Sequence, residues 1–174
     1  GLADATSTDT LLVAEVFGRS AGFVAQGIGA KVKAVRTLIP EEGSIDLEKL
    51  IQSLMDYYRQ RSNKGGVVIV SEGIKIAKDF ANNAAILEEV FAQNPKARIA
   101  FESVAELDQF GHPKLEDAAL IIYAVLKLKL KEAGIQVRLA GKLDYLFRSA
   151  PISENDIAMC TALGRGAVDY IAAG

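Results

Sequence analysis

The chain has 174 residues, of which 50% are hydrophobic and 24% charged, so it is long enough to bury a core and to form one domain or slightly more. Twenty basic residues face 22 acidic ones, a formal charge of −2, and no segment concentrates Lys and Arg with aromatic residues, which argues against a nucleic-acid partner. No apolar stretch approaches the roughly 20 residues that span a bilayer, and the amino terminus lacks the basic flank of a signal peptide. We therefore expect a cytoplasmic protein with no membrane partner.

Metal-ligating and redox-active residues are scarce. The single histidine, His112, leaves no histidine cluster for a metal, and the single cysteine, Cys160, cannot form an internal disulfide. Because Cys160 lies in a helical pattern, it is predicted to be a small core residue. The chain begins at Gly1 rather than at Met, which predicts a cut or processed chain.

The first third of the chain has a strand-helix-strand pattern. An almost continuous apolar run over 11–16 predicts a strand that is buried on both faces. The small, glycine-rich residues 20–31 predict a helix pressed tightly on a sheet. Residues 32–39 then alternate toward Pro40 and predict a second strand, because the proline ends regular structure.

The clearest amphipathic helix begins at Leu47, where apolar residues recur with helical spacing after a candidate cap at Ser44 or Asp46. The apolar run 67–70 that follows is typical of a central parallel strand. These two elements complete a second strand-helix-strand unit.

The second half continues the alternation. Residues 82–93 predict a helix, and residues 98–101 predict a short strand or no regular element. A longer apolar-striped helix is predicted over 114–133, with Pro near its first turn and Gly just past its end, and a strand over 135–143.

The last helix is predicted from a cap at Ser153. Ser153 and Asp156 have the spacing of a capping box, with Asp in place of the usual Glu. Because strands alternate with helices throughout, the fold class is α/β, a mostly parallel open sheet with helices on both faces.

Polar side chains follow three of the predicted strands. Phe17, Gly18 and Arg19 follow the first, Glu72 follows the run 67–70, and Tyr145 with Arg148 follows 135–143. If the strands are parallel neighbours, these groups meet outside the carboxyl edge of the sheet, where open α/β sheets bind ligands. Two arginines, a carboxylate and a phenol are suited to a phosphorylated polyol.

Each of these residues also has a structural interpretation. Arg19 follows a glycine and can bind phosphate bidentately, or it can be a solvated arginine on the first turn of a helix. Glu72 can accept hydrogen bonds from sugar hydroxyls, or it can cap the next turn. Taken alone, the spacing of Tyr145 and Arg148 favours an aromatic packed on the sheet beside an exposed arginine over a shared phosphate.

Four other features have weaker signals. Arg138 and Lys142 on the predicted strand are more consistent with a solvated strand face than with phosphate binding across a subunit interface. His112 is more typical of a helix cap than of a general acid or base. The pair Gly27 and Gly29 lies inside a predicted helix, so it is not a dinucleotide-binding fingerprint.

Taken in order, the motifs resemble the phosphofructokinase family, specifically its carboxyl-terminal, fructose-6-phosphate-binding half. Residues 12–22 (LVAEVFGRSAG) resemble the family's V-V-E-V-M-G-R-x-A-G, and residues 68–73 (VIVSEG) resemble its I-V-V-S/A-E-G. Residues 108–112 (DQFGH) and 144–149 (DYLFRS) are similar to the pyrophosphate-dependent branch. The resemblance extends from about residue 11 to residue 174 and implies a phosphofructokinase-like, Rossmann-like half.

The resemblance also implies roles for the site residues. Phe17, Gly18 and Arg19 are expected to contact the sugar phosphate, Glu72 a sugar hydroxyl, and Tyr145 with Arg148 the 6-phosphate. Phe17 stands where the family has Met. Arg138 is one residue out of step with the arginine that the family presents to a neighbouring subunit.

The family's G-G-D-G-[TS] donor loop and its T-[IV]-D-x-D catalytic segment have no counterpart in this sequence. The resemblance therefore implies the acceptor-binding part of a 6-phosphofructokinase, a glycolytic phosphotransferase that uses Mg²⁺ with pyrophosphate or, as a weaker expectation, ATP. This chain alone is expected to be inactive, with no catalytic residue and no metal of its own.

The resemblance predicts two parts: residues 1–150 as a sugar-phosphate-binding α/β domain, and residues 151–174 as a helix that normally packs on the missing amino-terminal donor-binding half. The full-length protein is expected to be a homo-oligomer. Two alternatives remain open from the sequence: a non-catalytic regulatory domain that binds a sugar phosphate, and an unrelated α/β domain with matching motifs.

Overall fold

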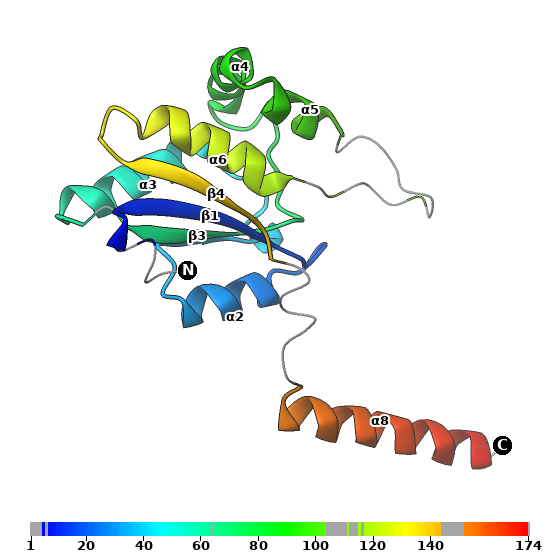
Figure 1. The fold of residues 1–174 in the computed structure, drawn as a ribbon. Helices are drawn as coiled ribbons and strands as arrows, with labels where there is room; N and C mark the ends of the chain where they lie inside the picture. Colours follow the sequence, from blue (N-terminus) through cyan, green and yellow to red (C-terminus); the bar gives the residue numbers. More distant parts are fainter. Residues whose placement is uncertain are drawn as a thin grey trace. The chain divides into compact units, whose positions relative to one another are not determined.

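The computed structural model describes residues 5, 7–63, 65–103, 111, 115, 117–143 and 152–173. The chain divides into two compact units, Gly1–Asp144 and Tyr145–Gly174. The first unit holds a four-stranded parallel sheet in the order β2-β3-β1-β4 (Figure 1). Its strands are β1 (Thr10–Val16), β2 (Arg36–Leu38), β3 (Gly66–Ser71) and β4 (Gln136–Lys142).

Helices cover both faces of this sheet, which confirms the α/β class that the sequence predicts. In Figure 1, α2 lies on one face and α6 on the other, with α4 and α5 packed outside α6. The helices of this unit are α2 (Phe23–Lys31), α3 (Leu47–Arg59), α4 (Asn83–Gln93), α5 (Pro95–Ser103) and α6 (Ala118–Lys129), with a 3-10 turn at Pro40–Glu42.

The core forms where apolar stripes of the helices meet the sheet. Every residue of β3 is buried, as a central parallel strand requires. Leu50 and Leu54 of α3 lie on one stripe and are almost fully buried, as are Ile122 and Leu126 of α6. The open question of the α3 cap is settled by Asp46, whose side chain accepts a hydrogen bond from the Lys49 amide.

Three predicted elements differ from the structure. Residues 98–101 are helical, because Pro95 begins α5 at the first helical position, where its missing N–H costs nothing. The strand predicted over 32–39 is reduced to Arg36–Leu38, and Lys33 has a φ of 50° in the turn before it. The helix predicted over 114–133 is shorter in the structure, where α6 covers Ala118–Lys129 and residues 130–134 form a turn.

The second unit contains helix α8 (Glu154–Ala172). Its predicted cap is confirmed: the Ser153 hydroxyl accepts from the Asp156 amide and donates to the Asp156 carboxylate. The prediction for Cys160 is wrong, because this residue is exposed, as are all the described residues of α8. The apolar periodicity of this helix is real, but within its own unit nothing in the described part of the chain covers it.

The strand order places a topological switch point between β1 and β3. From β1 the chain crosses through α2 to β2, and from β3 it crosses through α4, α5 and α6 to β4 on the other side. Neighbouring strands whose connections leave in opposite directions open a crevice at their carboxyl ends. The fold therefore provides a ligand-binding position directly after Val16 and Ser71.

Candidate functional site

The carboxyl ends of β1 and β3 bring two of the motifs together. Val16 pairs with Ser71 in the parallel register, and the Glu72 amide donates a hydrogen bond of 3.0 Å to the Val16 carbonyl. Phe17, Gly18 and Arg19 therefore leave the sheet beside Glu72. The sequence predicts that these residues lie close together, because the apolar runs 11–16 and 67–70 both have the pattern of buried parallel strands.

Glu72 organises the backbone of the loop that begins at Gly18. Its Oε1 accepts a hydrogen bond of 3.2 Å from the Gly18 amide, and the Ser71 hydroxyl donates to the Gly18 carbonyl at 3.3 Å. Gly18 has a φ of +142°, which is strained for any residue with a Cβ. The carboxylate predicted to contact a sugar hydroxyl thus also fixes the loop that carries Arg19, whose side chain is exposed.

The far end of this loop is held by a second carboxylate, Glu41, from the 3-10 turn. Both Glu41 oxygens accept from the Gly22 amide, at 2.8 and 3.0 Å. We define residues 18–22 as the acceptor loop. Sequence reasoning missed Glu41, because the contact joins residues 19 positions apart and only the neighbouring Pro40 marks the turn that presents it.

Replacing Glu41 by Ala is expected to loosen the acceptor loop without unfolding the domain. The Gly22 amide loses a charge-assisted acceptor, so its hydrogen exchange is expected to rise about tenfold. The matched control is Glu42→Ala, which removes the neighbouring carboxylate and its surface ion pair with Arg36. Equal exchange at Gly22 in both variants would contradict the role of Glu41.

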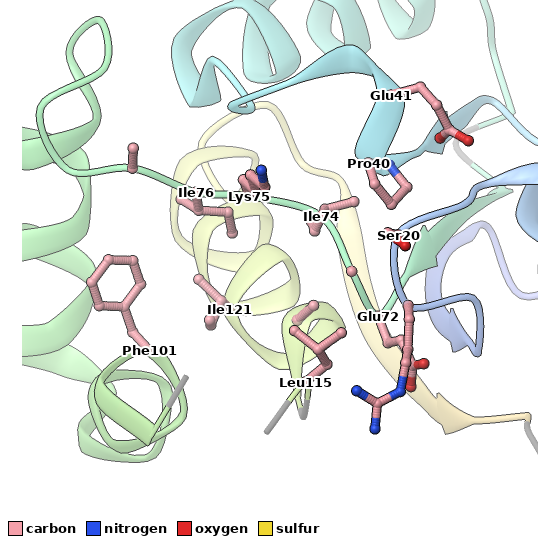
Figure 2. A pocket seen from close by; sticks show the side chains of 14 residues that line it. Ser20, Pro40, Glu41, Glu72, Ile74, Lys75, Ile76, Phe101, Leu115 and Ile121 are labelled. Carbon is pink, nitrogen blue, oxygen red and sulfur yellow. The ribbon is translucent and has the colours of Figure 1, made fainter. Parts of the chain in front are cut away.

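A pocket of about 860 Å³ opens beside the acceptor loop. Figure 2 shows Ser20, Pro40, Glu41 and Glu72 on one side of this pocket, with apolar side chains gathered on the other. The apolar wall is formed by Ile74, Ile76, Phe101, Leu115, Ala118 and Ile121. Arg19 and Lys75 also line the pocket, so both charge signs are present around it. Its size and mixed lining are suited to a small polar ligand.

The loop that lines the pocket after β3 is tied to the segment before α3. The Ile45 amide donates to the Lys75 carbonyl at 2.8 Å, and the Ala77 amide donates to the Ser44 hydroxyl at 3.0 Å. Asn83 is fully buried and joins both segments: it accepts from the Leu47 amide at 3.0 Å and donates to the carbonyls of Ile45 and Ala77. This part of the pocket is therefore preorganised.

Three residues singled out in the sequence, Tyr145, Arg148 and His112, lie outside the described residues. Arg138 is exposed on β4, in agreement with the interpretation as a solvated strand face. Lys142 on the same strand differs, since its ammonium lies 3.6 Å from Glu15 and 3.6 Å from Asp117. No local pattern in the sequence predicts this cluster.

Within the described part of the chain, no three His, Cys, Asp or Glu side chains lie close enough to hold a metal ion. None of these described residues is therefore assigned as a Mg²⁺ ligand. Among the same residues, no helix is both long and apolar enough to span a membrane.

The fold and the pocket define an open α/β protein with a candidate ligand site at its topological switch point. The family model for phosphofructokinase matches residues 2–171, and the chain belongs to this family. It is 28% identical over 176 residues to the pyrophosphate–fructose 6-phosphate 1-phosphotransferase of Thermotoga maritima, a match that covers 97% of the chain and 39% of that protein. It is 31% identical over 138 residues to the ATP-dependent 6-phosphofructokinase of Bacillus thuringiensis, covering 79% of the chain and 39% of that protein.

Solved structures agree on the fold. A pyrophosphate-dependent phosphofructokinase from Nitrosospira multiformis superposes with a TM-score of 0.64 at 22% identity, over 99% of this chain and 36% of that one. The phosphofructokinase of Saccharomyces cerevisiae gives 0.62 at 21% identity, over 96% of this chain and 17% of that one. The chain spans about two fifths of the length of the Thermotoga maritima and Bacillus thuringiensis relatives.

Proposed function

We propose that this chain is the fructose-6-phosphate-binding part of a 6-phosphofructokinase. The observation that carries the proposal is the meeting of Arg19 and Glu72 at the carboxyl ends of adjacent parallel strands, on the border of one pocket. In this proposal Arg19 binds the phosphorylated sugar through charge-assisted hydrogen bonds. Glu72 accepts hydrogen bonds from the sugar hydroxyls, and Phe17 and Gly18 provide backbone contacts beside them.

Tyr145 and Arg148 complete the proposed site as ligands of the 6-phosphate. Their support is the sequence motif and the position of β4, which runs parallel to β1 and ends just before them.

The complete enzyme is proposed to transfer a phosphoryl group from pyrophosphate, or less favourably ATP, to the 1-hydroxyl of fructose 6-phosphate, with Mg²⁺ at the donor. Relatives named for each donor are similar to this chain, so support for pyrophosphate comes from the motifs at residues 108–112 and 144–149. Because positioning the donor requires residues that this chain lacks, the chain alone is proposed to be inactive.

The exposed helix α8 is proposed to pack on the donor-binding half of the full-length protein. Its apolar residues Ile157, Leu163, Val168 and Ile171 are all more than half exposed, a large apolar area for a helix without a partner. The full-length protein is further proposed to be a homo-oligomer.

Calorimetric titration of this chain with fructose 6-phosphate tests the acceptor site. We expect saturable binding with a dissociation constant on the order of millimolar, because the site lacks the contacts of the other half. Arg19→Ala is expected to weaken binding about tenfold or more through the loss of a charge-assisted contact. Arg148→Ala is expected to do the same.

The matched control is Arg59→Ala, which removes an exposed arginine that pairs with Asp56 on α3 and does not line the pocket. Fructose controls for the phosphate and is expected not to bind measurably. Absence of fructose 6-phosphate binding by the folded chain would contradict the proposal for this chain. Binding that is equally weak for several unrelated phosphates would favour an α/β domain whose motifs match without shared function.

A further inference from the structure

A carboxylate lies buried beneath the pocket and has no part in the proposed sugar contacts. Glu15 is the penultimate residue of β1 and is only 2% exposed. It precedes the acceptor loop by three residues and faces the first turn of α6. Ala118 of this turn and Ile121 of the next line the pocket, so Glu15 lies behind one pocket wall.

Glu15 provides the cap that α6 lacks locally. Asp117 stands at the N-cap position with a φ of 64°, and its side chain makes no capping hydrogen bond. The Ala119 amide, second in the helix, instead donates a hydrogen bond of 2.9 Å to Glu15 Oε2. A strand residue thus supplies the negative charge that favours a helix amino terminus.

The same carboxylate also holds the end of β4. Lys142 Nζ lies 3.6 Å from Glu15 Oε1 and 3.6 Å from Asp117 Oδ1. The Glu15 carbonyl accepts from the Leu143 amide at 3.0 Å, so the side chain and the backbone of Glu15 act on the same stretch. Glu15 therefore joins β1, β4 and α6 at the edge where the ligand is proposed to bind.

Stability does not account for a charge at this position. Burial raises the pKa of Glu15 above its ordinary value; the Ala119 amide and Lys142 oppose this effect, while Asp117 and Glu72 add to it. Because desolvation is the largest of these effects, ionisation of the Glu15 carboxyl lowers the stability of the folded state. A neutral side chain of the same shape would fill the space at lower cost.

We propose that Glu15 is a positioning residue of the acceptor site, holding the α6 wall of the pocket and Lys142 in register with the acceptor loop. This inference rests on the proposed function for its ligand. It assigns Glu15 no contact with the sugar phosphate: its action passes through Ala119 and Lys142. Loss of the charge should therefore weaken ligand binding without weakening the fold.

The first test is Glu15→Gln, which keeps the shape and an acceptor for Ala119 but removes the charge. Affinity for fructose 6-phosphate is expected to fall about tenfold at pH 8, within the range of networks that act indirectly on a site. The urea midpoint is expected to stay equal or rise. Because the folded-state pKa of Glu15 is raised, the contribution of this group to wild-type stability falls as pH rises above its ordinary pKa, so the advantage of Gln grows with pH. A lower midpoint with unchanged affinity would show a purely structural role and overturn the inference.

Protonation gives a second signature. The wild-type chain should approach the Gln variant as Glu15 is protonated, so the ratio of their affinities should fall from about ten at pH 8 toward one as the pH is lowered through the raised pKa of Glu15. The phosphate of the ligand also titrates near pH 6, but it does so equally with both proteins and cancels in the ratio. A ratio that does not change with pH would overturn the inference.

Lys142→Met tests whether the effect passes through the ion pair. It is expected to weaken binding about as much as Glu15→Gln, and the double variant should show about a tenfold loss rather than a hundredfold one. The matched control is Glu89→Gln, which neutralises a surface carboxylate that pairs with Lys129 at the other end of α6. Additive losses, or an equal loss in the control, would contradict the inference.

Hydrogen exchange separates this inference from the proposed function. Glu15→Met removes the acceptor of Ala119, and exchange at Ala119 is expected to rise about tenfold. This measurement needs no ligand. If wild-type protein fails to bind fructose 6-phosphate, the proposed function fails; if Ala119 exchange is unchanged in Glu15→Met, the positioning role fails whether or not the ligand binds.

Discussion

Gly73→Ala is expected to abolish measurable binding of fructose 6-phosphate and to destabilise the domain by about 2–4 kcal/mol. A Cβ at Gly73 would lie 1.3 Å from the Arg19 carbonyl oxygen and 2.5 Å from the carbonyl carbon. Both atoms belong to backbone that Glu72 and Glu41 hold at the two ends of the acceptor loop. The loop must therefore move away from Gly73, taking Arg19 out of its position at the pocket.

Calorimetry and urea denaturation measure these two effects, with Gly27→Ala as the matched control. Gly27 lies on an exposed position of α2, where an added Cβ meets nothing within 4 Å among the described atoms. Alanine there should stabilise the chain by about 0.5–1 kcal/mol, because it favours the helix. If Gly73→Ala binds fructose 6-phosphate as tightly as the wild-type chain, the Arg19 carbonyl does not need the close approach to residue 73 that the structure shows.

Asn83→Ala is expected to cost about 3 kcal/mol or more of unfolding free energy, the largest effect of a single polar side chain in this domain. Its amide group satisfies one backbone N–H and two carbonyls in a buried position, and alanine leaves all three without this partner. The pocket loop after β3 also loses its tie to the segment before α3. Affinity for fructose 6-phosphate should therefore fall as well.

The neighbouring Asn82→Ala provides the control. Asn82 occupies the N-cap position of α4, but it is exposed and its side chain makes no capping hydrogen bond. Its replacement should change the unfolding free energy by less than about 0.5 kcal/mol. Equal urea midpoints for the two variants would mean that the buried amide network contributes little.

Local pattern was sufficient for several elements of both units. The apolar runs of β1 and β3, the stripe of α3 and the cap at Ser153 each depend on neighbouring residues, and the structure confirms them. The wrong prediction for residues 98–101 is also local in origin, because a proline ends a helix in its interior but starts one at its first position, which Pro95 occupies in α5.

The contacts that organise the site could not be predicted in this way. Glu15 meets Ala119 across 104 residues, and Asn83 meets Leu47 across 36. The apolar run around Glu15 predicts a buried strand, but nothing in the immediate sequence indicates which groups contact this carboxylate, because its environment is created by α6 and β4, which come much later in the chain. Sequence motifs predicted which edge of the sheet carries the candidate site, whereas the carboxylates that support this edge could be found only in the assembled sheet.

The exposed thiol of Cys160 makes the second unit separately addressable. The sequence holds one cysteine and no tryptophan, so a maleimide-linked fluorophore attaches at a single known point of α8 without background emission from indole. Fluorescence anisotropy of the labelled chain then reports the rotational freedom of α8. Adding the remaining part of a full-length relative in trans would reveal, as slower tumbling of the dye, whether that part captures the helix.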